Sequence, residues 1–191
     1  MKILAFGASS SRKSINKALV THAVARLKAS LPDVETEVLD LNDFEMPLFS
    51  VDREADELPD HAARFFRLIG EADGVVISFA EHNGNYTAAY KNLFDWASRI
   101  DAKVFQQKPV LALSTSPGKR GGASALGNFL QSAPHVGAEL VGSLSVPSFY
   151  DVFDTEKGAL KDSELETQLG EVLVAFAARV GGGDGVMTMT L

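Results

Sequence analysis

Residues 2–16 read KILAFGASSSRKSIN, and this stretch decides how the chain folds. Residues 2–6 form an apolar run typical of a buried strand, and residues 15–31 carry apolar side chains at helical spacing. Between them lie a glycine, four serines, an arginine and a lysine. The stretch therefore predicts a strand, a short polar loop rich in small hydroxyl side chains, and a helix that starts directly after this loop.

The composition of this loop favours an anion as its ligand. Hydroxyl residues at a helix N-terminus leave backbone N–H groups open, and the helix dipole favours negative charge there. A helix capped by a single serine is the structural alternative, but it needs only one of these hydroxyls. Arginine also matches the geometry of phosphate oxygens. We therefore expect a phosphate group to be bound by Ser9, Ser11, Arg12, Ser14, Ile15 and Asn16.

The motifs that this loop lacks limit the classes of phosphate ligand that it could bind. It has neither the Gly-x-x-x-x-Gly-Lys-Ser/Thr pattern of nucleoside-triphosphate loops nor the Gly-x-Gly-x-x-Gly dinucleotide turn. A hydroxyl-rich loop satisfies a phosphate monoester without Mg²⁺. The phosphate of flavin mononucleotide (FMN) fits this description, and a sugar phosphate fits equally well at this point.

Strand-like and helical patterns alternate along the rest of the chain. Such alternation predicts an α/β fold, a doubly wound parallel sheet between two layers of helices. With five strands, the expected topology is the flavodoxin-like order 2-1-3-4-5, whose ligand site lies at the carboxyl ends of the strands. The predicted strands cover residues 3–6, 36–41, 74–79, 109–114 and 139–146, and the predicted helices cover 15–31, 60–72, 86–100, 123–132 and 163–180.

The chain of 191 residues fits one domain, which we place at residues 1–180, with 181–191 as a flexible C-terminal tail. Residues 42–59 hold two prolines, several acids and weak periodicity. We interpret them as an ordinary packed surface loop, with a lid or a subunit contact as the alternatives.

Composition excludes several classes of function. A formal net charge of −7 without a basic cluster argues against a nucleic-acid partner. The absence of cysteine excludes disulfides, thiol nucleophiles and iron–sulfur ligation, and no His spacing indicates a metal. No apolar run is long enough for membrane insertion, and the chain begins in a strand without a signal-like segment, so we expect a cytoplasmic protein.

Two further loops should meet the first at the same sheet edge. AEHNGNYT at residues 80–87 follows the third predicted strand and contains an Asn-Gly turn, which exposes backbone donors and acceptors to the edge of a planar ligand. TSPGKRGG at 115–122 follows the fourth strand, and its glycines allow close approach to a flat ring. The residues expected to border the ring are Glu81, His82, Asn83, Gly84 and Asn85 on one side, and Ser116, Gly118, Gly121 and Gly122 on the other.

These motifs resemble the NADPH-dependent FMN reductase family, which includes azo, quinone and chromate reductases. The resemblance rests on residues 9–19, on 81–84 through 90–96, and on 114–118 with 121–122. Relative to the family pattern, the first loop holds one extra residue, so the family arginine corresponds to Ser11 or, by a shift, to Arg12. Ala80 replaces a proline, His82 a tyrosine and Asn85 a serine.

The resemblance implies an FMN-dependent oxidoreductase that takes hydride from NADPH or NADH and reduces a small acceptor such as a quinone, an azo compound or free flavin. It also suggests a homodimer or homotetramer. We assign no catalytic residue because the cofactor carries the chemistry, although His82 is a candidate proton donor. His22, on a predicted helix, is expected to be solvated or interfacial. The alternatives are a flavodoxin-type electron carrier and a non-enzymatic regulatory protein that binds a phosphate ligand.

Overall fold

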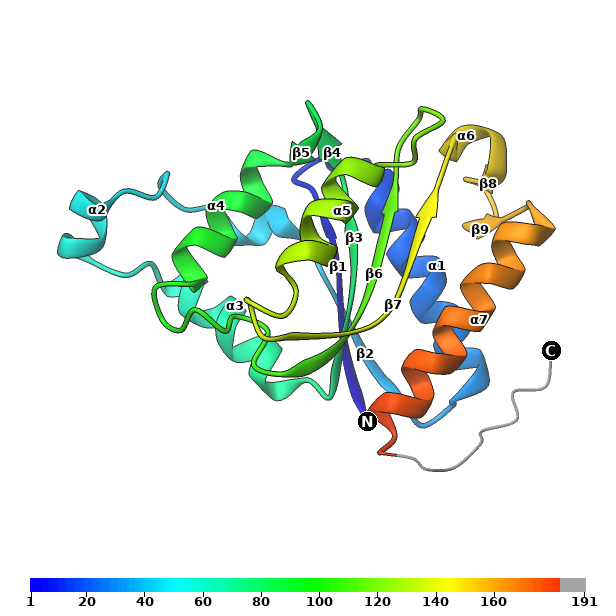
Figure 1. Cartoon of the computed structure of the whole chain (residues 1–191), viewed down its shortest axis with the longest axis horizontal. Helices are drawn as coiled ribbons and strands as arrows, with labels where there is room; N and C mark the ends of the chain where they lie inside the picture. The colour runs from blue at the N-terminus through cyan, green and yellow to red at the C-terminus, as the bar shows by residue number, and fades with distance from the viewer. Residues whose placement is uncertain (183–191) are drawn as a thin grey trace.

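A five-stranded parallel sheet forms the centre of the computed structural model, which describes residues 1–182 (Figure 1). Its strands are β1 (Lys2–Ala8), β2 (Glu35–Leu39), β3 (Gly74–Phe79), β6 (Lys108–Thr115) and β7 (Ala138–Val146). They lie in the order β2-β1-β3-β6-β7, and all neighbours are parallel. The predicted 2-1-3-4-5 order is confirmed, and the order reverses between β1 and β3.

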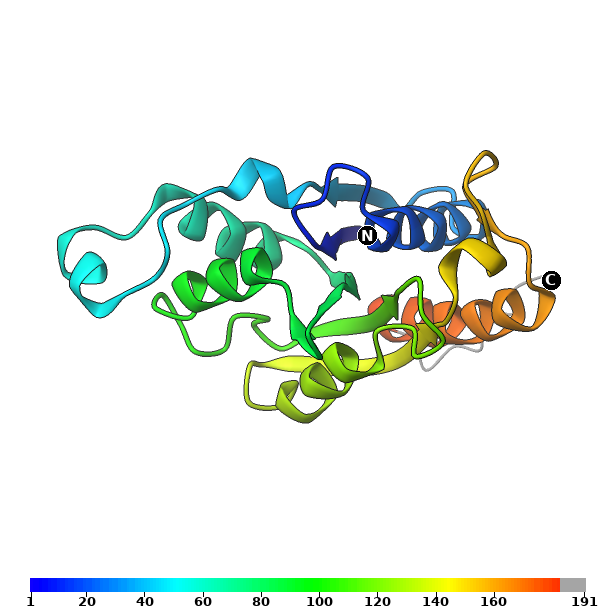
Figure 2. The same ribbon diagram turned by 90° about the horizontal axis from the view of Figure 1, so that it is seen from above.

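Helices cover both faces of the sheet, so the fold has three layers (Figures 1 and 2). On one face, α1 (Ile15–Ser30) and α7 (Ser163–Val180) enclose one apolar core. On the other face, α3 (Asp60–Glu71), α4 (Ala88–Ala97) and α5 (Ala123–Ser132) enclose a second core. Every residue of β3 is buried, which explains the uninterrupted apolar character of that strand.

Several short elements lie at the carboxyl-end edge of the sheet and elsewhere on the surface. They are η1 (Leu41–Phe44), α2 (Val51–Asp56), the hairpin β4 (Glu81–His82) with β5 (Asn85–Tyr86), α6 (Phe149–Val152), and the hairpin β8 (Phe153–Asp154) with β9 (Ala159–Leu160). The helix predicted from residue 86 begins only at Ala88. Tyr86 pairs with Glu81 in the hairpin, and the buried Thr87 side chain caps the helix by accepting the Tyr90 N–H.

The surface segment 42–59 is packed at its start and exposed at its end. Trp96 of α4 donates its Nε1–H to the carbonyl of Pro47 at 2.7 Å, and Asn92 Oδ1 accepts the Phe49 N–H at 2.8 Å. The Phe49 ring also meets Trp96 edge-on. By contrast, α2 has no buried residue and stands away from the sheet (Figure 1). Two side chains of α4 therefore anchor a segment whose tip is free of the core.

His22 is buried, so of the two expected environments the solvated one is wrong. Its Nε2 lies 2.9 Å from Glu166 Oε2 on α7, because α7 covers the face of α1 that carries it. The expected tail begins at Gly181, and residues 183–191 lie outside the described part of the chain. Within residues 1–182, each helix is too short or too polar to cross a lipid bilayer.

Candidate functional site

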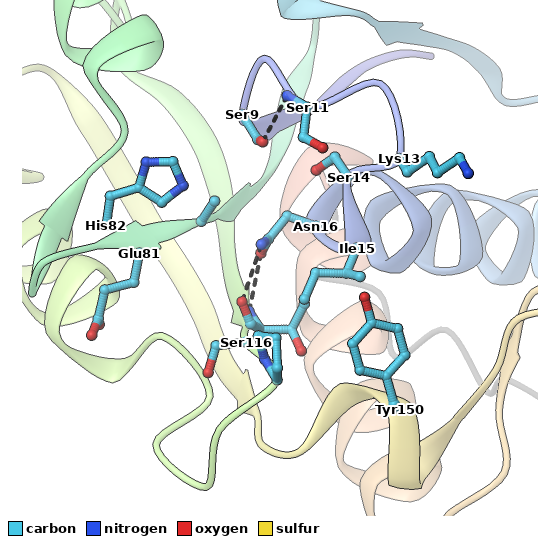
Figure 3. Close-up of a pocket in the computed structure, with 13 residues that line it drawn as sticks. Ser9, Ser11, Lys13, Ser14, Ile15, Asn16, Glu81, His82, Ser116 and Tyr150 are labelled. Carbon is cyan, nitrogen blue, oxygen red and sulfur yellow. Dashed lines mark hydrogen bonds between the residues drawn. The ribbon is translucent and has the colours of Figure 1, made fainter.

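A cavity of about 210 Å³ opens at the carboxyl ends of the strands, where the strand order reverses. Its walls come from the loop after β1, the start of the β4–β5 hairpin, the loop after β6, and α6 (Figure 3). Three loops far apart in sequence thus meet at one edge, as the topology predicts. Of the residues expected at the site, the cavity brings together Ser9, Ser11, Ser14, Ile15, Asn16, Glu81, His82 and Ser116.

The first loop presents donors to this cavity. Ser14 is the N-cap of α1, and its hydroxyl accepts the Lys17 N–H at 3.2 Å. Ser9 Oγ accepts the Ser11 N–H at 3.2 Å, which fixes the loop. Within residues 1–182, the backbone N–H groups of Ile15 and Asn16 have no acceptor. Open N–H groups beside three hydroxyls at a helix N-terminus fit a phosphate monoester.

The side chain of Asn16 is held by the sheet. It is 2% exposed, donates from Nδ2 to the Thr115 carbonyl at 3.1 Å, and accepts the Thr115 N–H at 3.0 Å. The Ser78 hydroxyl donates to the same Oδ1 at 2.7 Å. Asn16 therefore ties the start of α1 to the ends of β3 and β6, and its backbone N–H is the group left for an anion.

The β4–β5 hairpin forms the opposite wall (Figure 3). The exposed His82 ring borders the cavity, whereas Asn83 and Gly84 form the turn, with φ of 52° and 76°, outside its lining. Asn85 is turned toward α5, where its Oδ1 accepts from Asn128 Nδ2 at 3.3 Å. The tip of the hairpin is thus an exposed edge outside the cavity, and the hairpin lines the cavity with Glu81 and His82 of β4.

Glu81 has a structural task that the sequence does not reveal. Its Oε2 accepts the N–H groups of Ser124 and Ala125 at 2.8 and 3.1 Å. Both donors belong to the first turn of α5, whose N-cap residue Gly122 offers no side-chain acceptor. A carboxylate at a helix N-terminus is favourable. Glu81 therefore locks the loop after β3 to the loop after β6.

The glycines of the third loop divide into two kinds. Gly118 is exposed, and a Cβ there would meet only the Ser116 hydroxyl, at 3.9 Å. Gly121 and Gly122 have φ of 57° and 77°, and neither lines the cavity. A Cβ on Gly121 would lie 2.5 Å from Ser145 Oγ. These two glycines are needed for the turn and for packing, which the turn signal alone does not show.

Tyr150 is a site residue that sequence reasoning missed. It lies on α6, just beyond the end of β7, is 61% exposed, and its ring faces the cavity opposite His82 (Figure 3). Two backbone bonds hold α6 against the third loop, from Ser148 N–H to the Gly118 carbonyl and from Phe149 N–H to the Ser116 carbonyl. The sequence signal that could have identified it is the aromatic pair Phe149 and Tyr150, which follows β7, the last strand of the central sheet. Other lining residues not predicted are Lys13, Ala80, Thr115 and Pro117.

Arg12 lies outside the first cavity and lines a second, of about 540 Å³, on the other side of Tyr150. Lys17 also lines this second cavity and pairs with Asp40 at 2.6 Å. The hydrogen bond from Lys17, together with one from the Asn42 N–H, lowers the pKa of the Asp40 carboxyl to about 2.

In the described part of the chain, no cluster of three or more His, Asp or Glu side chains could hold a metal ion.

Comparison with known proteins agrees with this geometry. The family model for NADPH-dependent FMN reductase matches residues 1–151. The chain is 30% identical to the NADPH:quinone oxidoreductase of Arabidopsis thaliana, over 95% of this chain and 94% of that protein. It is 27% identical to an NAD(P)H-dependent FMN reductase of Pseudomonas aeruginosa, over 95% and 98% of the two chains.

The solved structure of a flavoenzyme NAD(P)H:(acceptor) oxidoreductase from Paracoccus denitrificans shares the fold, with a TM-score of 0.77 and 23% identity over 95% of this chain and 97% of that one. The family match covers the three loops that build the cavity, and it spans all five strands of the sheet. This chain therefore belongs to the NADPH-dependent FMN reductase family, whose members are oxidoreductases that use FMN with NAD(P)H.

Proposed function

We propose that this protein binds FMN in the cavity at the carboxyl ends of the strands and reduces a small acceptor of the quinone class with NADPH or NADH. The observation that carries the proposal is the set of open N–H groups at the start of α1, beside the hydroxyls of Ser9, Ser11 and Ser14. This set has the donors that a phosphate monoester requires. The two other loops border the space beyond it.

Each wall residue has a defined task in this arrangement. The serines and the N–H groups of Ile15 and Asn16 would hold the phosphate, and the backbone of the loop around Ser116 would border the ring. His82 and Tyr150 would flank the ring from opposite sides. When bound, FMN supplies the hydride chemistry, and the protein supplies position and electrostatics. No side chain needs to act as an acid or base, so we assign His82 a contact role.

The acceptor class is inferred from the relatives. The Arabidopsis thaliana relative is named for quinone reduction, and it covers nearly the whole chain. The cavity is open to solvent between the exposed side chains of His82 and Tyr150, which lie on opposite sides of it, so a flat acceptor could reach the ring. We propose a quinone for that reason. We also propose a homodimer or homotetramer, because Leu48, which precedes α2, and Val51, its first residue, are large apolar side chains exposed away from the core.

An electron carrier of the flavodoxin kind is less well supported. Such carriers place aromatic rings on the flavin, and Tyr86 is the aromatic nearest to the two ring loops. In this structure the Tyr86 ring packs against Phe79 and Tyr90, in the core. Burial also raises the pKa of its hydroxyl. The Tyr86 ring therefore packs against the core and does not line the cavity, so that, among the described residues, Tyr150 is left as the one Phe, Tyr or Trp ring in the cavity wall.

A spectroscopic titration tests the proposed function. The protein is saturated with FMN, separated from free flavin, and mixed anaerobically with NADPH or NADH. We expect the visible flavin bands to bleach, and 1,4-benzoquinone to restore them with turnover. Retained FMN that neither nucleotide bleaches would identify a carrier. Failure to bind FMN at all would contradict the cofactor assignment and favour a regulatory protein with another phosphate ligand.

A further inference from the structure

The second cavity lies between α1 and the segment that follows β7. Its volume of about 540 Å³ falls in the range of about 300–1,000 Å³ that is typical of small-molecule sites. Much of its lining comes from the outer side of α1, from α6 and from the β8–β9 hairpin, which lies beside α1 (Figures 1 and 2). The two cavities have four lining residues in common, Lys13, Ser14, Ile15 and Tyr150. Most of the second cavity is therefore built by residues that have no task in the proposed FMN site.

The inner wall of this cavity is apolar. The rings of Phe149 and Phe153 stack with their centroids 4.6 Å apart, and both residues are buried. Ile15 and Ala18 of α1 are half-buried and pack against the same core. His22 of α1 meets Phe153 edge-on at 5.9 Å, which fixes the β8–β9 hairpin against α1. This wall suits the apolar body of a ligand.

The charged groups of the second cavity are all positive. Among the described residues, its lining includes Arg12, Lys13 and Lys17 but no Asp or Glu. Lys17 is paired with Asp40, whereas Arg12 and Lys13 are exposed and form no ion pair within residues 1–182. The whole chain has a net charge of −7, so these cations do not reflect a general excess of basic residues. A guanidinium beside an ammonium is well suited to bind a carboxylate.

We infer that the second cavity binds an aromatic carboxylate. The flat apolar body lies against the wall formed by Ile15, Ala18 and Phe149, and the carboxylate pairs with Arg12 and Lys13. A purely apolar ligand would leave the two cations unpaired, and an inorganic anion would leave the apolar wall uncovered. The site is independent of the proposed function, because its ligand is neither FMN nor a nicotinamide and takes part in no electron transfer.

A pair of probes that differ in charge tests the carboxylate contact. Calorimetric titration of the FMN-saturated protein compares 2-naphthoate with 2-naphthamide, which has a similar shape and no charge. We expect 2-naphthoate to bind at least 10-fold more tightly at low salt. Arg12→Gln with Lys13→Gln should bring the ratio of the two affinities near 1. The control, Lys157→Gln with Lys161→Gln, removes the same charge from exposed positions outside the lining and should keep the ratio.

A second pair of variants tests whether the ligand lies in this cavity. Thr21 is exposed on α1 and lines the second cavity but not the first, and its hydroxyl donates to the Lys17 carbonyl at 2.8 Å. Thr21→Trp places an indole in the cavity and should weaken 2-naphthoate binding at least 10-fold, with FMN retention unchanged. Thr167 of α7 forms the same kind of bond, to the Ser163 carbonyl, but lies outside the lining. Thr167→Trp should therefore leave the affinity for 2-naphthoate unchanged.

Several results would overturn the assignment. Equal affinity of the wild type for the two probes, or no binding of 2-naphthoate at millimolar concentration, would contradict the carboxylate contact, as would an unchanged ratio in the Arg12, Lys13 variant. Unchanged 2-naphthoate affinity in Thr21→Trp, or release of FMN in proportion to the 2-naphthoate bound, would place the probe elsewhere. Failure of the wild type to retain FMN would instead contradict the proposed function, and the Thr21 and Thr167 variants of the FMN-free protein would still decide this site.

Discussion

Asn16 and Thr115 exchange two hydrogen bonds across 99 residues of sequence, one from Asn16 Nδ2 to the Thr115 carbonyl and one from the Thr115 N–H to Asn16 Oδ1. Ser78 adds a third bond to the same amide. One buried side chain thus sets the distance between the start of α1, where the phosphate is proposed to bind, and the ends of the two central strands.

Replacing Asn16 should destabilise the protein strongly. Asn16→Ala leaves the Thr115 N–H, the Thr115 carbonyl and the Ser78 hydroxyl without their partner, at a cost on the order of 3 kcal/mol. Urea unfolding measures this loss. Asn128→Ala is the control, because Asn128 forms one long surface bond to Asn85, and it should change stability by less than about 0.5 kcal/mol. Equal losses of unfolding free energy in the two variants would show that the Asn16 hydrogen bonds stabilise the protein no more than a surface hydrogen bond does.

Glu81 should matter for α5 rather than for chemistry. Glu81→Ala removes the acceptor of the Ser124 and Ala125 N–H groups, and we expect a loss of about 1–2 kcal/mol in the free energy of unfolding. Glu156→Ala, in the exposed β8–β9 turn, provides a matched carboxylate deletion that should be nearly neutral. A stability loss that is the same in both variants would rule out the capping role.

The Lys17–Asp40 pair should make stability depend on acid pH. The folded-state pKa of Asp40 is about 2, below the ordinary carboxyl value of 3.8, so its contribution is complete above about pH 5 and disappears as pH falls toward 2. Because the pair is partly exposed, we expect Asp40→Asn to cost about 1 kcal/mol at pH 7 and almost nothing at pH 2. Urea midpoints at several pH values test this. A cost that stays constant from pH 7 to pH 2 would contradict it.

The projecting segment around α2 should contribute to assembly. Leu48 and Val51 are 69% and 73% exposed, although both are large and apolar. Such side chains gathered on one projection are typical of an interface. We expect light scattering to give the mass of a dimer or tetramer at micromolar concentration, and Leu48→Glu with Val51→Glu to shift it toward the monomer. A monomer mass for the wild type at every concentration would contradict this prediction.

Regular elements were predictable because their signals are local. Gly74–Phe79 is a continuous apolar run, and Ala123–Ser132 and Ser163–Val180 have helical spacing, so their ends agree with prediction. The start of α4 was predicted two residues early. There the Asn-Gly turn closes a two-residue hairpin that takes Tyr86 out of the helix, and apolar spacing does not report such pairing.

The sequence allows the prediction that three loops meet at the site, but it does not allow prediction of the side-chain contacts within the site. Parallel topology brings the ends of β1, β3 and β6 together, and hydroxyls and glycines mark them. The bonds of Asn16 and Glu81 join residues 43 to 99 positions apart, so no local pattern contains them. Arg12 follows Ser11 directly, yet it lines the neighbouring cavity, because its direction depends on the backbone of the loop.

The most direct test of the FMN site compares FMN with riboflavin, which lacks the phosphate. Fluorescence titration gives both affinities for the wild type and for Ser11→Ala with Ser14→Ala, with Ser50→Ala, the cap of α2, as control. Asn16 is left intact because its side chain holds the sheet. Each lost charge-assisted bond costs about 1.5–3 kcal/mol, so FMN should bind the double variant at least 100-fold more weakly, with riboflavin affinity unchanged. Equal affinity of the double variant and the wild type for FMN would contradict the placement of the phosphate at the start of α1.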